Sequence, residues 1–312
     1  MSRKSAFSLI EMLVAVAVFT LLLTILAGAY SGIERAISQT NARREANATG
    51  RAALEWITRD LERIRPPTPG FIWSVTQNTN TNRPVATLGS QFLIASDQIA
   101  TNTLNPHAAF WQVANEEGAG RTMAIVGYFV RWITETNNGA STRRPVLCRL
   151  YLNQTNAAYP ASLNTANGTW LDDNLLTNAP GDAAGSYRGW FADNVHSIWF
   201  RALDANGAPI SSNASSTNFT NGSFDSRQGY LSGTNRIMGP ALPSSVEVAV
   251  IVMNPQRLQG NTATYPVLSG LGSNPANFWS DIQSAMNDTS IPPQIRESLR
   301  LYSTRVPISY AK

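Results

Sequence analysis

Cysteine, histidine and charged residues are all scarce in this chain of 312 residues. Cys148 is the only cysteine, which excludes a disulfide within the chain. Charged residues make up 14% of the sequence, against about 25% in an average globular protein. The two histidines, His107 and His196, lie in no recognisable nucleophile motif, and neither a metal-ligand spacing nor a phosphate-binding glycine loop is present. The sequence therefore predicts no catalytic, cofactor-binding or metal-binding residue, and an enzyme is the least favoured class.

The excess of positive charge is small and forms no stripe. The formal net charge is +4, and two of the positive residues, Arg3 and Lys4, lie within the first six positions. The other arginines are scattered, whereas a surface that follows a nucleic-acid backbone needs basic residues gathered along one element. The charge pattern therefore indicates no nucleic-acid partner.

One long apolar run lies near the N-terminus. From Met12 to Ile33, 22 consecutive residues carry no charge, and about 20 such residues cross a bilayer as a helix. The preceding residues 1–6 are short and basic, which holds the N-terminus on the cytoplasmic side. A secretory signal peptide has a shorter apolar core that ends in a small-x-small cleavage site. Since this run continues into more helix, we expect residues 7–33 to be a retained transmembrane helix.

Glu11 stands at the start of the apolar run, where an unpaired carboxylate is costly. It either lies among headgroups and water or pairs with a positive group. Residues 6–14, AFSLIEMLV, resemble the type IV prepilin cleavage site. The resemblance implies cleavage by a prepilin peptidase between Ala6 and Phe7, and methylation of the new amine on Phe7. It also implies that this amine pairs with Glu11 of a neighbouring subunit, which offsets both desolvation costs. The family usually has glycine before the cut, where this chain has Ala6.

The helix is predicted to continue beyond the membrane. An apolar stripe recurs at helical spacing at Leu54, Ile57, Leu61 and Ile64. Proline-rich residues 66–69 then stop the helix. We therefore expect residues 34–65 to form an exported amphipathic half, with bends favoured at Gly28, Gly32 and Gly50. Unbroken, residues 7–65 would span roughly 90 Å.

Residues 66–312 are predicted to form a β-rich exported domain. Extended, alternating patterns predict strands at residues 71–75, 91–96, 108–113, 122–133, 145–152, 195–203 and 244–253. Asn-rich stretches at 76–90, 153–186 and 204–236 are typical of surface loops. Short helices are predicted at 275–287 and 293–302, and a last strand near 305–310. Asp204-Ala205-Asn206-Gly207 is interpreted as a hairpin turn rather than a calcium loop, since the further acidic ligands are missing. The fold class is thus α+β, with a long N-terminal helix packed on a mainly antiparallel sheet.

Three downstream segments extend the resemblance. Residues 52–62, 195–207 and 242–248 are similar to the helix end, the middle strand and turn, and the following strand of J-class minor pseudopilins of type II secretion systems. The chain is longer than is usual for that class. The resemblance implies association with the I- and K-class minor pseudopilins and the major pseudopilin. It also implies a single pass through the bacterial inner membrane, with the C-terminal domain in the periplasm.

The favoured function is therefore structural: a minor pseudopilin at or near the tip of a periplasmic pseudopilus. A minor pilin of a type IV pilus, serving adhesion or DNA uptake, is the alternative within the same architecture. A membrane-tethered glycan-binding module is an alternative of another class, because eight tryptophans are present. The polar stretch from Ser38 to Asn47 suits a wet interface between parallel helices, with Arg43 and Arg44 facing acidic residues of a neighbour.

Overall fold

The computed structural model describes residues 9–64, 92–95, 104–114, 123–137, 140–153, 188–211, 214–215, 218–219, 224–226, 230–232, 235–238, 241–253 and 275–309. The chain divides into two compact units, Met1–Glu45 and Ala46–Lys312. The predicted strand at 71–75 and the predicted loop at 76–90 lie outside the described residues, as does nearly all of the predicted loop at 153–186.

A single helix dominates the N-terminal part. Helix α1 (Leu9–Glu62) runs for 54 residues without interruption, about 80 Å at the usual rise per residue. Gly28, Gly32 and Gly50 all lie within it, so none of the three glycines breaks the helix. It ends at Glu62, four residues before the first proline of the predicted stop.

The larger sheet is antiparallel and has six strands in the order β5-β4-β3-β2-β1-β9. Its strands are β1 (Phe92–Ala95), β2 (Leu104–Ala114), β3 (Met123–Asn137), β4 (Ala140–Asn153), β5 (Arg188–Asp193) and β9 (Phe224–Asp225). The hairpin of β3 and β4 is the longest pairing, running from Ala124 opposite Asn153 to Asn137 opposite Ala140. β5 was not predicted from the sequence, and β3 and β4 are longer than predicted.

The smaller sheet has three antiparallel strands in the order β13-β12-β6. They are β6 (Val195–Leu203), β12 (Ser245–Val252) and β13 (Arg300–Pro307). Two short helices, α3 (Phe278–Met286) and α4 (Pro293–Arg296), precede β13. A 3-10 turn, η2 (Pro275–Asn277), leads into α3.

The predicted helix over 293–302 is wrong in its second half. α4 ends at Arg296, and residues 300–307 pair with β12 along the whole length of that strand. The Tyr302 ring packs on the backbone of Gly50 in α1, and Val306 is fully buried. Tertiary contacts on both sides of an extended segment have overridden its local helical pattern.

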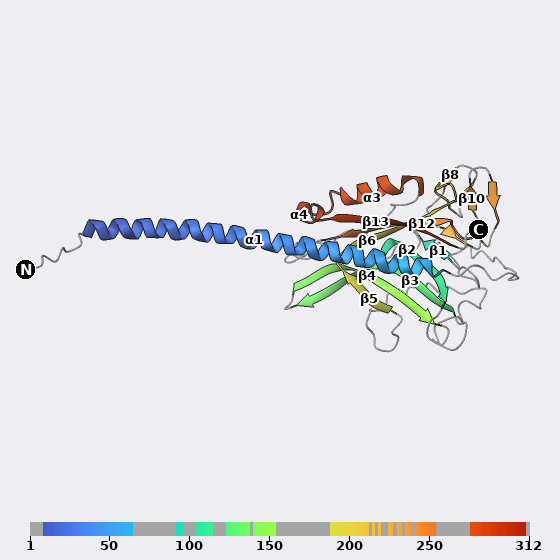
Figure 1. Cartoon of the computed structure of the whole chain (residues 1–312), viewed down its shortest axis with the longest axis horizontal. Coiled ribbons are helices and arrows are strands. Elements are labelled where there is room, and N and C mark those ends of the chain that lie inside the picture. Colours follow the sequence, from blue (N-terminus) through green and yellow to red (C-terminus); the bar gives the residue numbers. More distant parts are fainter. Residues whose placement is uncertain are drawn as a thin grey trace, which may run out of the picture. The chain divides into compact units, whose positions relative to one another are not determined.

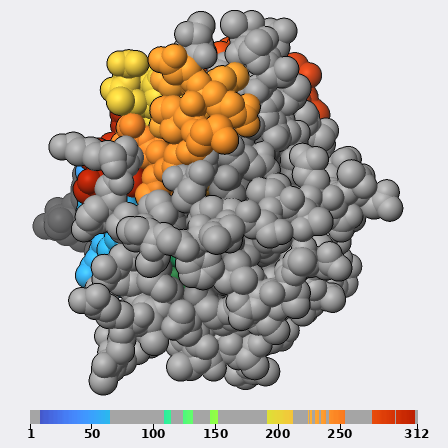
Figure 2. Space-filling view, turned by 90° about the vertical axis from the view of Figure 1, so that its right-hand side faces the viewer, coloured from blue at the N-terminus to red at the C-terminus, as the bar shows by residue number. Residues whose placement is uncertain are grey.

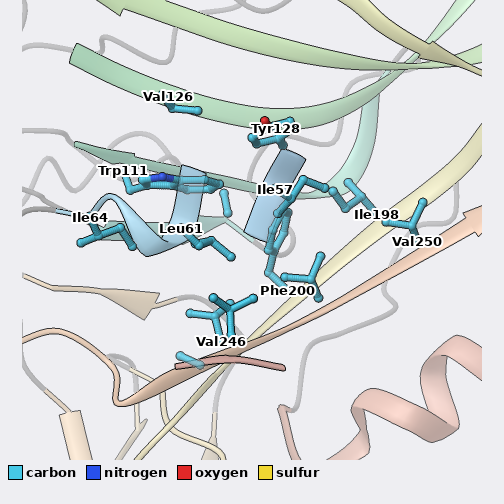
Figure 3. Close-up of a cluster of buried hydrophobic side chains, with 14 of the residues drawn as sticks. Ile57, Leu61, Ile64, Trp111, Val126, Tyr128, Ile198, Phe200, Val246 and Val250 are labelled. Atoms are coloured by element: carbon cyan, nitrogen blue, oxygen red, sulfur yellow. The ribbon is translucent and has the colours of Figure 1, made fainter. Parts of the chain in front are cut away.

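The main core encloses the second half of α1. Figure 3 shows Ile57 and Leu61 between Trp111 and Tyr128 of the larger sheet on one side and Phe200 of the smaller sheet on the other. The opposite face of the smaller sheet carries α3 and α4, packed through the second core (Figure 1). Its buried side chains are Trp199, Ala249, Ile251, Met253, Phe278, Ile282, Ala285, Ile291, Ile295 and Leu299. The smaller sheet is therefore buried on both faces, and this explains why β12 is apolar at nearly every position.

The stretch predicted as a loop at 204–236 contains short strand pairs. These are β7 (Ala214–Ser215) with β8 (Asn218–Phe219), and β10 (Tyr230–Ser232) with β11 (Asn235–Ile237). Figure 2 shows the orange-coloured part of the chain, which includes β10 and β11, at the surface. The α+β class with a long N-terminal helix and antiparallel sheets is confirmed.

Candidate processing and assembly site

The predicted processing site lies at the very start of the chain. Ala6 and Phe7 fall outside the described residues, which begin at Leu9. Glu11 is the third residue of α1, with an exposed side chain. A carboxylate in the first turn of a helix interacts favourably with the unsatisfied backbone N–H groups there. The placement of Glu11 is therefore compatible with local helix stability as well as with pairing to a neighbour.

The first part of α1 has the properties of a membrane anchor. Large apolar side chains from Leu9 to Ile37 are exposed, and the helix is long and apolar enough to cross a bilayer. Its hydroxyl groups bond within the helix: Thr20 Oγ1 donates to the Val16 and Ala17 carbonyls at 3.0 and 2.9 Å, and Thr24 Oγ1 donates to Thr20 at 2.8 Å. Because lipid offers no hydrogen-bond partners, such internal bonds allow threonine within the bilayer. This helix is a candidate single-pass anchor.

Arg43 and Arg44 are exposed on α1, within the same compact unit as Glu11. The 32 residues from Glu11 to Arg43 correspond to about 48 Å along the helix. Glu11 and the arginine pair therefore form two separate surfaces on one element rather than one site.

A buried polar cluster at the other end of α1 was missed by the sequence analysis. We call it the Asp60 cluster; its members are Asp60, Trp111, Tyr128 and Arg149. The Asp60 side chain is 1% exposed. The Tyr128 hydroxyl donates to Asp60 Oδ2 at 2.6 Å, Arg149 Nε donates to the same oxygen at 2.9 Å, and Arg149 Nη2 donates to Oδ1 at 3.2 Å. Trp111 Nε1 donates to the Asp60 backbone carbonyl at 2.9 Å.

The cluster ties α1 to three strands of the larger sheet. Trp111 lies on β2, Tyr128 on β3 and Arg149 on β4. Burial raises the pKa of Tyr128 far above its ordinary value, and the negative charge of Asp60 raises it further, so the phenol stays protonated and donates. Burial is the largest single effect on the pKa of Arg149 and acts to lower it, but the hydrogen bonds and charge interactions with Asp60 and Tyr128 together outweigh burial, and the pKa is raised. The charged and hydrogen-bonded Asp60 cluster therefore fixes the position of α1 along the larger sheet.

The signal for Asp60 was present in the sequence. Asp60 stands three residues after Ile57 and four before Ile64, which places it on the apolar stripe rather than on the solvated face. A carboxylate on a stripe of this kind needs a buried cation or donors, because burying it alone is costly. Which strands supply those partners depends on the tertiary fold and could not be predicted.

Cys148, His196 and Asp204 belong to residue types that serve in catalysis or ion binding, and all three are buried in the fold. Cys148 is buried, and burial raises the pKa of its thiol to about 12, so the reactive thiolate is disfavoured. His196 is buried, and burial lowers its pKa to about 4. The Asp204 carboxylate accepts from Asn206 N at 2.9 Å, Ala208 N at 2.8 Å and Ser232 Oγ at 2.6 Å, which confirms the hairpin turn. Gly207 has φ +79°, as that turn requires.

Metal-ligating side chains do not gather in the part of the chain that the structure describes. No group of three or more His, Cys, Asp or Glu side chains is placed there to hold an ion.

A family model described as the prokaryotic N-terminal methylation motif matches residues 1–27. Comparison with curated proteins gives no match, and comparison with solved structures gives none. The matched segment contains Ala6, Phe7 and Glu11 and the candidate anchor as far as Ala27. The motif supports a type IV pilin-like N-terminus, and it implies processing by a prepilin peptidase and assembly with other pilin-like subunits. It distinguishes neither the secretion or pilus system nor the class of subunit.

Proposed function

We propose that this pilin-like chain is a minor pseudopilin of the J class, working at or near the tip of a periplasmic pseudopilus in a type II secretion system. The observation that carries the proposal is that a prepilin-type N-terminus leads directly into a bilayer-length helix, and that this same helix ends inside the core of an antiparallel β domain. A subunit of this form is held by the membrane before assembly and by its helix afterwards. Its role is structural rather than catalytic.

The three segments similar to J-class pseudopilins come together in the fold. Residues 52–62 form the last turns of α1, residues 195–207 form β6 and its turn, and residues 242–248 include the first half of β12. β6 and β12 are paired, and both pack on α1 through the main core. Segments far apart in the sequence thus form one structural unit, which supports a resemblance of the domain and not only of its N-terminus.

Assembly would depend on charge pairing inside the bilayer. Cleavage before Phe7 frees a cationic amine, and Glu11 of the adjacent subunit supplies the carboxylate. In a low dielectric each charge alone is costly, whereas the pair offsets both costs and fixes the axial register of the two helices. Further along α1, the exposed Arg43 and Arg44 would face acidic residues of a neighbouring helix.

The test is co-purification of the full-length protein from its native membrane. Recovery of I- and K-class minor pseudopilins would support the proposal, and recovery of type IV pilus subunits in their place would assign the chain to a pilus. Glu11→Ala should leave membrane insertion intact, because it removes a polar group from the anchor, but should reduce recovery of the partners. Unchanged recovery with Glu11→Ala would mean that the carboxylate only meets headgroup water.

A further inference from the structure

Strand β13 is the outer strand of the smaller sheet, and it pairs with β12 alone among the strands that the structure describes. In an antiparallel pair, every second residue of a strand points both its N–H and its C=O group toward the partner strand. The backbone groups of the intervening residues point away from the partner. Ile308 N donates to the Ser244 carbonyl at 2.9 Å, which sets this alternation for the pair. In the register of this pair, the backbone groups of Tyr302, Thr304 and Val306 therefore bond β12, opposite Val250, Val248 and Val246.

The backbone groups of Leu301, Ser303 and Arg305 therefore point away from β12. Within the described part of the chain, none of these groups has a backbone hydrogen bond on that side. Pro307 is the next residue whose backbone faces away from β12, so its missing N–H removes no hydrogen bond from the sheet. We call the backbone of residues 301–305 on this side the open edge.

The arginines of β13 do not shield the open edge. Basic side chains often protect an exposed edge by projecting across it. Here Arg300 Nη1 donates back to the carbonyls of Glu297 and Leu299 at 3.0 and 2.7 Å, and Arg305 Nε donates to Ser245 Oγ at 2.9 Å. Both guanidinium groups are thus held on the domain itself. The residue at the centre of the edge is Ser303, which is exposed and small.

The edge is also rigidly supported. Tyr302 packs on the α1 backbone at Gly50, and its hydroxyl donates to Asn47 Oδ1. Leu301 packs on the opposite core with α3 and α4. A strand fixed on both faces has little conformational freedom left to lose when another strand pairs with it, which lowers the cost of binding.

We infer that the open edge of β13 is a docking site for an extended strand of another pilin-like subunit, added to the smaller sheet by backbone hydrogen bonds. β13 carries Arg300 and Arg305 and no acidic residue, so the incoming strand would carry acidic or uncharged residues beside these two positions. The inference rests on the proposed function for the identity of the partner. When a strand is added to a sheet edge, the backbone hydrogen bonds supply the affinity, and the charges of Arg300 and Arg305 would select which strand binds.

The test compares Ser303→Pro with Ser303→Ala in the full-length protein purified in detergent. Proline at 303 removes an outward N–H and places its ring where the partner strand would lie, whereas the bonds to β12 use neighbouring residues. Alanine changes the side chain and leaves the backbone donor. The probes are the soluble domains of the I-class, K-class and major pseudopilins of the same cell, added one at a time and followed by calorimetry.

The inference predicts that one of these domains binds the parent and Ser303→Ala alike, and binds Ser303→Pro at least tenfold more weakly. Amide hydrogen exchange of Leu301, Ser303 and Arg305 in the parent protein is a second readout, which does not depend on how the proline variant folds. Those three amides should become protected on binding. Equal binding by Ser303→Pro, or no protection of these amides with any of the domains, would overturn the inference. Protection that appears only when the chain binds a second copy of itself would overturn the choice of partner. The processing of the N-terminus at Phe7 tests the pilin-like assignment independently.

Discussion

At the scale of single residues, Asp60 is the most informative side chain outside the N-terminal motif. It is a carboxylate in the core, and its two oxygens receive three hydrogen bonds from Tyr128 and Arg149. Trp111 also donates to the Asp60 backbone carbonyl, so the residue has partners on three strands and contributes to specificity as well as to stability. A helix shifted by one residue along the sheet would break the hydrogen bonds of Tyr128 and Arg149 to the buried Asp60 carboxylate, and a buried carboxylate that loses its partners is strongly unfavourable.

Asp60→Ala is therefore expected to lower the free energy of unfolding by about 3 kcal/mol, the low end of the range for breaking a buried pair, because Arg149 keeps some contact with solvent. Tyr128→Phe removes one bond to the carboxylate and should cost about 1.5–3 kcal/mol. Urea unfolding of a fragment beginning at residue 34 measures both. Glu62→Ala, at an exposed position on the same helix, is the matched control and should change stability by less than about 0.5 kcal/mol. Equal effects of Asp60→Ala and Glu62→Ala would contradict the role given to the cluster.

His196 predicts a pH dependence of stability. It is buried on β6, its Nδ1 lies 3.3 Å from Ser197 Oγ, and burial lowers its pKa from 6.5 to about 4, with Asp288 acting in the opposite direction. In the unfolded chain the imidazole becomes protonated below about pH 6.5. In the folded chain it becomes protonated only near its lowered pKa of about 4. Stability is therefore full above the unfolded pKa and falls as the pH drops toward 4. The contribution of His196 to the free energy of unfolding should be about 2 kcal/mol smaller at pH 5 than at pH 7. Urea unfolding at the two pH values measures it, and His196→Gln should lose this part of the slope. An unchanged slope would show that other groups cause it.

At the scale of elements, most segments with a strong local pattern were predicted correctly from the sequence. The predictions failed where tertiary contacts determine the secondary structure. The apolar run and the stripe at Leu54 to Ile64 predicted α1 correctly, because both follow from spacing along one helix. β12 was also predicted, since Val246, Val248, Val250 and Val252 repeat at period two. The segment 293–302 was predicted as helix, but half of it joins β13, where pairing with β12 outweighs local preference. Nothing local indicated that Gly50 is a contact point for that strand.

The contact of α1 with β13 gives an element-scale prediction. A Cβ placed on Gly50 would lie 2.3 Å from the Tyr302 ring, so Gly50→Ala forces a shift in one of the two elements. Despite the better helix propensity of alanine, the variant should be destabilised by about 1–3 kcal/mol. Adding Tyr302→Ser removes the ring and should make Gly50→Ala neutral or stabilising. This double-mutant cycle, followed by thermal unfolding, reports the coupling directly. Additive effects of the two substitutions would mean that α1 and β13 are not in contact at this point.

At the scale of the whole molecule, the two compact units contain different functional features. The unit Met1–Glu45 holds the methylation motif, Glu11 and the apolar helix, all of which could be recognised from the sequence because each depends on local order and composition. The unit Ala46–Lys312 holds the Asp60 cluster and the open edge of β13, which arise only when distant segments meet. The methylation motif and the candidate anchor were thus recognisable from the sequence, whereas the Asp60 cluster and the open edge of β13 were not.

The central claim is that the chain is made as a prepilin and processed before it assembles. Intact mass and N-terminal sequencing of the protein extracted from the membrane of its native cell test this most directly. The mature chain is expected to begin at Phe7, to lack residues 1–6 and to carry one added methyl group on its amine. A chain that retains Met1, or one that begins after residue 25 and has lost the apolar helix, would contradict it.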